Sequence, residues 1–223
     1  MARRWGFRMN LTLEAFRSAF DGGPAPGAGS EAAVARTSHL ELLRAIDAEL
    51  PGPARVAVVG ESALALGAGS IDDVPTLEIA AVDFRDFWEA AERAGTQRGT
   101  GPALRPARDL RAPFAWRDRL SATHLPGLTR LQVLLPERHD LALLLAGSGL
   151  ASDLQRAEEL HRARPLRPGV LLARHHEADD GRIENDGAFV LGFLALAHRL
   201  FGADLAGRLE AHLAGEAPAP EVA

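Results

Sequence analysis

The sequence predicts an α/β protein of the α+β type, with a small mixed β-sheet flanked by helices and a helical C-terminal subdomain. Two short runs rich in β-branched residues, Val56–Val59 and Thr76–Val82, predict buried strands. Segments with apolar residues at helical spacing lie before, between and after these runs, and beyond Pro165 only the helical pattern remains. With 223 residues, the chain is long enough for one core with a helical extension.

Stretches rich in Gly and Pro divide the chain into four predicted segments. The stretch 21–29 separates an aromatic N-terminal arm, with a predicted helix at Leu11–Phe20, from the rest of the chain. Trp5, Phe7 and Phe16 in so short an arm favour contact with a partner. The segments are the arm and linker (1–29), a sheet domain (30–164), a helical subdomain (165–214) and a flexible tail (215–223).

Helices and strands are predicted to alternate in the first half of the chain. A helix that begins at Ser30 has one apolar stripe and ends at Pro51. It is followed by a strand at Val56–Val59, a turn at Gly60, a short helix at Ser62–Leu66, a strand at Thr76–Val82 and a helix at Asp83–Gly95.

The second half is predicted to be mostly helical. Residues 96–126 are predicted to be loops with short strands around Ala112–Trp116 and Ser121–Thr123. A better strand at Leu128–Leu135 ends at Pro136, where a helix begins. Further helices are predicted at Pro168–Arg174, Glu184–Phe201 and Asp204–Ala214.

Composition excludes several classes of protein. The chain has no cysteine, which rules out a disulfide framework and a Cys-based zinc site. All 25 basic residues are arginine and the net charge is -5, so binding to nucleic acid is not expected. The N-terminus has no apolar core of a signal peptide and no run is long enough to span a bilayer, which predicts a cytoplasmic protein without a membrane partner.

The turn at Gly60 is the first candidate site. A strand that ends in Gly before a helix exposes backbone N–H groups, and with the helix dipole these attract an anion such as a phosphate. Ser62 is the candidate N-cap of that helix. The alternative is that Gly60 serves only the turn and Ser62 only the cap.

The segment VVGESALALGAGS, followed by TLEIAAVD, resembles the opening of DNA-polymerase-β-like nucleotidyltransferases, in particular small bacterial ones related to abortive-infection toxins. The resemblance runs from about residue 30 to 164. It implies that Gly60, Ser62 and Glu78 bind nucleotide. It also implies a strand with two carboxylates one residue apart, which hold Mg²⁺ beside a nucleoside triphosphate.

Only part of that metal-binding pattern is present. Glu78 stands at the first carboxylate position, but its partner position is Ala80, and the later strand offers Gln132. Asp83 is a second candidate metal ligand, although its odd spacing from Glu78 places it on the other face of a regular strand. The resemblance also implies a lysine at about the position of Leu145, in a helix that carries the expected Asp140-Leu141 pair.

Two other acidic clusters are candidates for metal ligands. Asp72 and Asp73 precede Pro75 and are predicted to form a solvated turn. His175, His176 and Glu177 form the richest cluster of potential ligands. Neighbouring histidines on a helix point about 100° apart, so this cluster is interpreted as a solvated helix end.

Two functional hypotheses follow. The first is a pseudoenzyme with the nucleotidyltransferase fold and no cofactor, which acts as a binding, regulatory or structural partner in a bacterial assembly. The second is an active Mg²⁺-dependent nucleotidyltransferase of the toxin–antitoxin type, in which Glu78 and Asp83, or Asp72 or Asp73, hold the metal. A third possibility is a scaffold that associates with itself or with a protein partner through the arm and the C-terminal helices. The sequence favours the first.

Overall fold

The computed structural model describes residues 39–68, 76–81, 84–98, 103–107, 110–179 and 187–220. The chain divides into two units, Met1–Ala32 and Ala33–Ala223, and all of the described residues belong to the second. The arm and linker at 1–29, including the helix expected at Leu11–Phe20, therefore lie outside the described residues.

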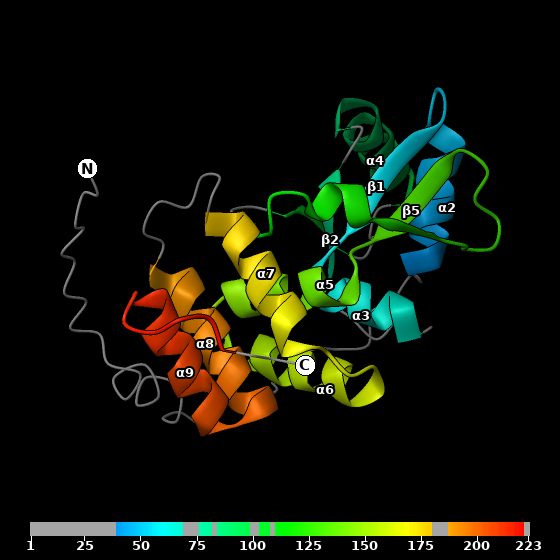
Figure 1. The fold of residues 1–223 in the computed structure, drawn as a ribbon. Coiled ribbons are helices and arrows are strands. Elements are labelled where there is room, and N and C mark those ends of the chain that lie inside the picture. The colour runs from blue at the N-terminus through cyan, green and yellow to red at the C-terminus, as the bar shows by residue number, and fades with distance from the viewer. Residues whose placement is uncertain are drawn as a thin grey trace, which may run out of the picture. The chain divides into compact units, whose positions relative to one another are not determined.

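The described chain contains one sheet, with helices before, between and after its strands, which confirms the α/β class (Figure 1). The strands are β1 (Ala54–Val58), β2 (Thr76–Ala81), β3 (Ala103–Pro106), β4 (Ser121–Thr123) and β5 (Leu131–Leu135). The helices are α2 (His39–Glu49), α3 (Gly60–Ala68), α4 (Phe84–Arg98), the 3₁₀ helix η2 (Trp116–Arg119), α5 (Arg138–Gly147), α6 (Ala151–Ala163), α7 (Pro168–Asp179), α8 (Gly187–Phe201) and α9 (Ala203–Leu213).

The five strands form one mixed sheet in the order β3-β2-β1-β5-β4. The central strand β1 is antiparallel to β2 and parallel to β5. At the edges, β3 is parallel to β2, and β4 is antiparallel to β5. The α3 helix connects β1 to β2, so Gly60 lies where the central strand passes into a helix.

Of the two short strands predicted within residues 96–126, one is confirmed and the other is wrong. The strand at Ser121–Thr123 is present as β4, but Ala112–Trp116 is not a strand. This segment turns instead, with the Trp116 N–H donating to the Pro113 carbonyl at 3.1 Å, and η2 begins there. β3 was not predicted, because its sequence ALRP ends in proline and has no apolar alternation.

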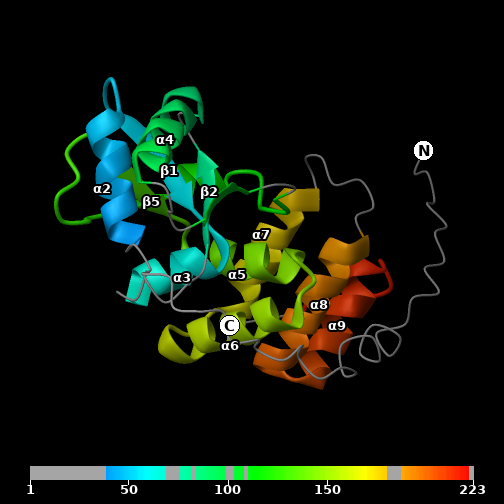
Figure 2. The same ribbon diagram turned by 180° about the vertical axis from the view of Figure 1, so that it is seen from behind.

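Helices α2 and α4 pack together and cover one face of the sheet, as the two opposite views show (Figures 1 and 2). They cover the side chains of β1 that alternate with Ala57, namely Val56 and Val58, both fully buried. The opposite face carries Ala57 and Val59, and it is this face that receives the candidate site.

Asp47 fastens α2 to the start of β5. Its carboxylate accepts hydrogen bonds from the N–H groups of Thr129 (3.0 Å), Arg130 (2.7 Å) and Leu131 (2.6 Å), and from the Thr129 hydroxyl (2.9 Å). Burial alone would raise the pKa of Asp47, but these hydrogen bonds outweigh it and hold the pKa below its usual value.

The helices after β5 pack around α5. Residues from His139 to Gly147 of α5 are all buried, and α5 contacts α6, α7 and α8. At the crossing with α8, a Cβ on Gly192 would lie 2.2 Å from the carbonyl oxygen of Ala146, so only glycine allows this approach. No helix in the described part of the chain is long and apolar enough to cross a membrane.

Candidate functional site

Gly60 forms the turn from β1 into α3. Its φ of +62° lies in the left-handed region that favours glycine. A Cβ at this position would lie 2.7 Å from Oε2 of Glu78. The backbone therefore favours glycine here, and a Cβ would require the Glu78 side chain to shift. We call Gly60, Ser62 and Glu78 the Gly60 corner.

Glu78 lies on β2 directly beside the end of β1. The Val59 N–H donates to its carbonyl at 3.0 Å, and its carboxylate reaches the first residue of α3. Arg105, its neighbour on β3, lies 3.4 Å from the carboxylate. The helix N-terminus and the guanidinium both attract negative charge. An anion of the protein itself thus lies in the place where the sequence predicted a phosphate.

Ser62 joins α3 to β2. Its side chain is only 1% exposed. The hydroxyl donates to the Thr76 carbonyl at 2.9 Å and accepts from the Glu78 N–H at 3.2 Å. The structure thus brings Gly60, Ser62 and Glu78 together, and the hydrogen bonds of the Ser62 hydroxyl hold the strand that carries Glu78.

Ala80 lies on the same face of β2 as Glu78, two residues further along. It packs against a buried apolar group that we call the Trp116 cluster. Its buried members are Ala57, Val59, Trp116, Leu134 and Leu144. Leu110, Ala112 and Leu120 pack on the same group from the segment around η2. The space beside Ala80, where the second carboxylate would project, is therefore lined by hydrocarbon.

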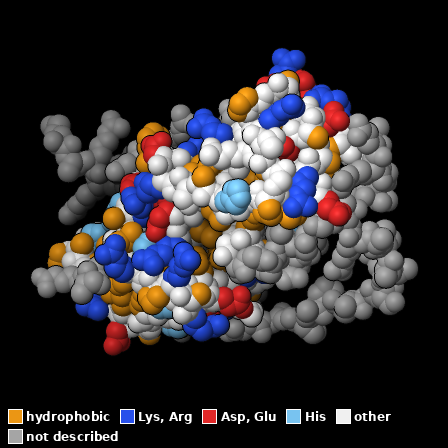
Figure 3. Space-filling model, turned by 90° about the vertical axis from the view of Figure 1, so that its right-hand side faces the viewer, with side chains coloured by type: hydrophobic (Ala, Val, Ile, Leu, Met, Phe, Trp, Pro, Cys, Tyr) orange, Lys and Arg blue, Asp and Glu red, His pale blue; other side chains and the backbone are white. Residues whose placement is uncertain are grey.

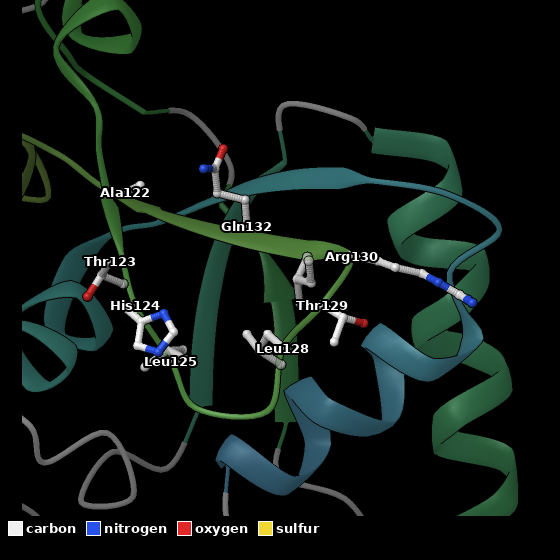
Figure 4. A pocket seen from close by; sticks show the side chains of 9 residues that line it. Ala122, Thr123, His124, Leu125, Leu128, Thr129, Arg130 and Gln132 are labelled. Atoms are coloured by element: carbon white, nitrogen blue, oxygen red, sulfur yellow. The ribbon is translucent and has the colours of Figure 1, made fainter.

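Gln132 lies far from Glu78. The register pairs Gln132 with Arg55, whereas Glu78 lies beside Val59, four residues further along the central strand. At about 3.3 Å per residue, the two side chains are separated by about 13 Å along the strands, in addition to the width of β1. Figure 4 shows Gln132 projecting from the opposite side of β5 to Leu128, next to a pocket of about 320 Å³. Gln132 and Glu78 cannot bind the same cation.

The other candidate metal ligands give no further support to a cation site. Asp72, Asp73 and Asp83 lie outside the described residues. Glu61, in the first turn of α3, forms an ion pair with Arg156 of α6. Within the described ranges, no group of three or more His, Cys, Asp or Glu side chains is placed to hold one metal ion.

A second polar site was not predicted. Arg119, Asp140, Arg174 and Glu177 form what we call the α7 charge cluster. Arg119 donates to both carboxylate oxygens of Asp140, at 2.7 and 2.8 Å, and to Glu177 at 3.0 Å. Arg174 donates to Glu177 at 2.6 Å, and its Nε lies 3.7 Å from Asp140. The Asp140 side chain is fully buried, so this is a partly buried network of two acids and two arginines joined by four ion pairs.

The pKa shifts in this cluster follow from the same contacts. The hydrogen bond to Asp140 is the main reason why the pKa of Arg119 is raised. Partial burial would raise the pKa of Glu177, but the hydrogen bond from Arg174 and the charge of Arg119 lower it below its usual value. Arg119 and Glu177 are therefore both charged at neutral pH.

The interpretation of His175, His176 and Glu177 as a solvated helix end is wrong. The α7 helix continues to Asp179, and the His175 side chain is 1% exposed. Its ring stacks on Phe189 and Phe193 of α8, with centroids 5.0 and 4.4 Å away. Neither ring nitrogen has a hydrogen-bond partner among the described residues. Burial, with a smaller effect from His176, lowers the pKa of His175 to about 4.

A groove lies between α3, α5 and α6. It has a volume of about 790 Å³, and apolar side chains such as Leu64, Leu141 and Leu160 line it. Glu137, Arg138, Glu159 and Arg164 add charges of both signs. On the face of the molecule in Figure 3, basic and acidic side chains are likewise interspersed rather than separated. This distribution agrees with the net charge of -5.

Comparisons with protein-family models, with curated proteins and with solved structures find no match for this chain.

Proposed function

We propose that this chain is a bacterial nucleotidyltransferase-like protein that has lost metal-dependent catalysis and acts as a binding, regulatory or structural partner in an assembly. The observation that carries the proposal is the packing of Ala80 on the Trp116 cluster, beside the lone carboxylate of Glu78. Two-metal nucleotidyl transfer needs several oxygen ligands that converge on Mg²⁺. A methyl group packed on hydrocarbon supplies none.

The order of the elements supports the kinship. A helix (α2), a central strand (β1), a glycine turn at Gly60, a short helix (α3) and a second strand (β2) follow one another, and a later strand (β5) pairs with β1. This is the order that the resemblance of the sequence implies. The kinship itself is part of the proposal.

The position of Glu78 supports the loss of nucleotide transfer. Its carboxylate lies against the N-terminus of α3, where a triphosphate would otherwise be attracted. Without a cation between them, the carboxylate and a phosphate would repel each other. Arg105 is 64% exposed and lies 3.4 Å from the Glu78 carboxylate, so it offsets only a small part of this negative charge.

A protein is the proposed partner, either another protein or a second copy of this chain. Two large apolar side chains are strongly exposed among the described residues, Phe114 (73%) and Leu150 (58%). The segments that carry them meet where Arg111 donates to the Gly147 carbonyl at 2.9 Å. Large apolar side chains that are exposed in this way are candidates for contact with a protein partner.

Titration calorimetry with each of the four ribonucleoside triphosphates, with and without Mg²⁺, tests the loss of catalysis. We expect no Mg²⁺-dependent binding and no transfer of label from radioactive triphosphates to RNA or protein. Glu78→Ala is the control, and it should behave as the unchanged chain does. Tight Mg²⁺-dependent binding that Glu78→Ala abolishes would instead establish the active enzyme, with Asp72, Asp73 or Asp83 as the second ligand.

Light scattering tests the partner role. The full chain is compared with a chain that begins at residue 30, and a lower mass for the shorter chain would assign self-association to the arm. Equal monomeric masses would reject self-association through that arm. The double variant Phe114→Ser, Leu150→Ser makes the same test for the exposed apolar pair, and both variants should keep the native circular dichroism spectrum.

A further inference from the structure

Two histidines from different helices face each other at the C-terminal end of the chain. His176 lies on α7 and His212 in the last turn of α9, and their Nε2 atoms are 3.3 Å apart. The rings are nearly perpendicular, with an interplanar angle of 75°. Both side chains are only partly buried, so small solutes can reach the pair.

The proton on His212 can be assigned from its other nitrogen. Nδ1 of His212 lies 3.2 Å from the carbonyl oxygen of Ala217. A carbonyl only accepts hydrogen bonds, so Nδ1 must carry the proton. In the neutral ring, Nε2 of His212 is then a bare lone pair that points at His176.

The Ala217 carbonyl is held in place by the chain around it. The N–H groups of Glu216 and Ala217 both donate to the Ala211 carbonyl, at 2.9 and 3.2 Å, so the chain folds back over the end of α9. A backbone carbonyl that binds Nδ1–H and fixes the tautomer is the usual support of a metal-binding histidine.

We propose that His176 and His212 bind a divalent transition-metal ion of the Zn²⁺ class through their Nε2 atoms. Two imidazole nitrogens, each about 2.0–2.1 Å from a tetrahedral Zn²⁺, lie about 3.3 Å apart, which matches the observed separation. Without metal, the same distance fits a hydrogen bond in which His176 Nε2–H donates to His212. When the metal binds, His176 takes the other neutral tautomer, with its proton on Nδ1.

The remaining coordination positions fall to water or to a group from another molecule. Within the described ranges, no third His, Cys, Asp or Glu joins the pair. The side chain of His175 does not take part in the pair. Its ring centroid is 6.2 Å from that of His176, and its ring stacks on Phe189 of α8. Because it has open positions, the site exchanges its ion, in contrast to a closed structural zinc site. Its effect is to fasten α9 to α7.

The test uses the full chain without a polyhistidine tag. Thermal unfolding is followed at pH 8 with Zn²⁺, with Ni²⁺ and with Mg²⁺, which prefers oxygen ligands. We expect a hundredfold excess of Zn²⁺ over its Kd to raise Tm by about 5 °C or more and Mg²⁺ to leave it unchanged. Lowering the pH to 5.5 should abolish the rise, because protons compete for both nitrogens.

The variants His176→Gln and His212→Gln should each weaken Zn²⁺ binding, measured by calorimetry, at least about tenfold. His124→Gln, in the connection between β4 and β5, is the matched control and should bind as the unchanged chain does. No rise in Tm for the unchanged chain, or a rise that persists in the double variant, would overturn the proposal.

A spectrum of the unchanged chain keeps the test independent of how the variants fold. With one equivalent of Cu²⁺, electron paramagnetic resonance should detect coupling to two imidazole nitrogens. Coupling to one nitrogen or to none would equally reject the two-histidine site. Neither result depends on whether the Gly60 corner binds nucleotide.

Discussion

The Gly60 corner and the α7 charge cluster are both polar sites, but the residues of the cluster are much further apart in the sequence than those of the corner. The corner is made by Gly60, Ser62 and Glu78, which lie within one strand–helix–strand unit. The cluster joins residues as far apart as Arg119 and Glu177, 58 positions away. A motif in the sequence could indicate the first, whereas the second exists only once the helices have packed.

The two sites also differ in what surrounds their charges. In the corner, one carboxylate meets one arginine, and its neighbouring position Ala80 packs on apolar side chains. In the cluster, two acids and two arginines form four ion pairs around the fully buried Asp140. The lesson is that a motif locates a site, while its chemistry depends on side chains that pack on it from distant segments.

Removing the central acid of the α7 charge cluster should have the largest effect. Asp140→Ala leaves Arg119 and Arg174 partly buried without their shared carboxylate, so we expect the free energy of unfolding to fall by about 3–5 kcal/mol. Urea denaturation measures it. Glu177→Gln is the control, because Glu177 is 31% exposed and should cost about 1 kcal/mol. Equal losses in the two variants would contradict the central role of Asp140.

His175, next to Glu177 on α7, should make stability depend on pH. Its pKa is about 4 in the folded protein, against about 6.5 in an unfolded chain. Between these values the unfolded chain binds one more proton, so stability falls as pH drops from 6.5 to 4, by about 3 kcal/mol in total. Urea denaturation of the unchanged chain and of His175→Leu at pH 7 and 4.5 isolates this effect.

The leucine variant should lose most of that difference. It also removes two buried ring nitrogens without partners, so it should be no less stable than the unchanged chain at pH 7. An unchanged pH dependence in His175→Leu would show that another group is responsible.

Restoring the missing carboxylate of the corner should sharpen the comparison. Ala80→Asp places a charge against the Trp116 cluster, which we expect to destabilise the fold by about 2 kcal/mol. Ala173→Asp, at an exposed position on α7, is the control and should cost less. Thermal unfolding with and without Mg²⁺ shows whether the lost stability is due to the absence of a bound cation. If Mg²⁺ restored the stability of Ala80→Asp, the corner would be a cation site that lacks only one ligand.

The glycine turn should have the smallest effect. Gly60→Ala strains a residue with positive φ and crowds Glu78, at a cost of about 1–2 kcal/mol. Gly67→Ala in the same helix is a matched control, because a Cβ there meets nothing within 4 Å. It should stabilise the protein by up to about 1 kcal/mol. Chemical denaturation of both variants measures the difference, and a gain in both would mean that the Glu78 contact carries no cost.

The sequence was sufficient for most of the fold because the main elements have clear local patterns. β1 and β2 are short runs with β-branched residues, β5 is a short apolar run that ends before Pro136, and helices α2 and α8 have apolar stripes, so each was predicted near its observed position. β3 was missed because its pairing with β2, rather than any pattern of its own, makes it a strand.

The sites were harder to predict from the sequence than the elements. Gly60, Ser62 and Glu78 were identified because a turn and a strand fix their positions locally. His175 was misread as solvated because the two phenylalanines that bury it come from α8, which begins at Gly187. His176 and His212 likewise meet only through the packing of α7 and α9 around α8, and no spacing along the chain indicates such a pair.

The bonds from Asp47 to residues 129–131 set a condition on biosynthesis. A ribosome releases α2 long before it has made the start of β5, some 82–84 positions later. Until then, the Asp47 carboxylate stays hydrated and the central strand lacks its parallel neighbour. The sheet is therefore completed only after β5 has been synthesised, and until then the edge of β1 that pairs with β5 has no partner strand.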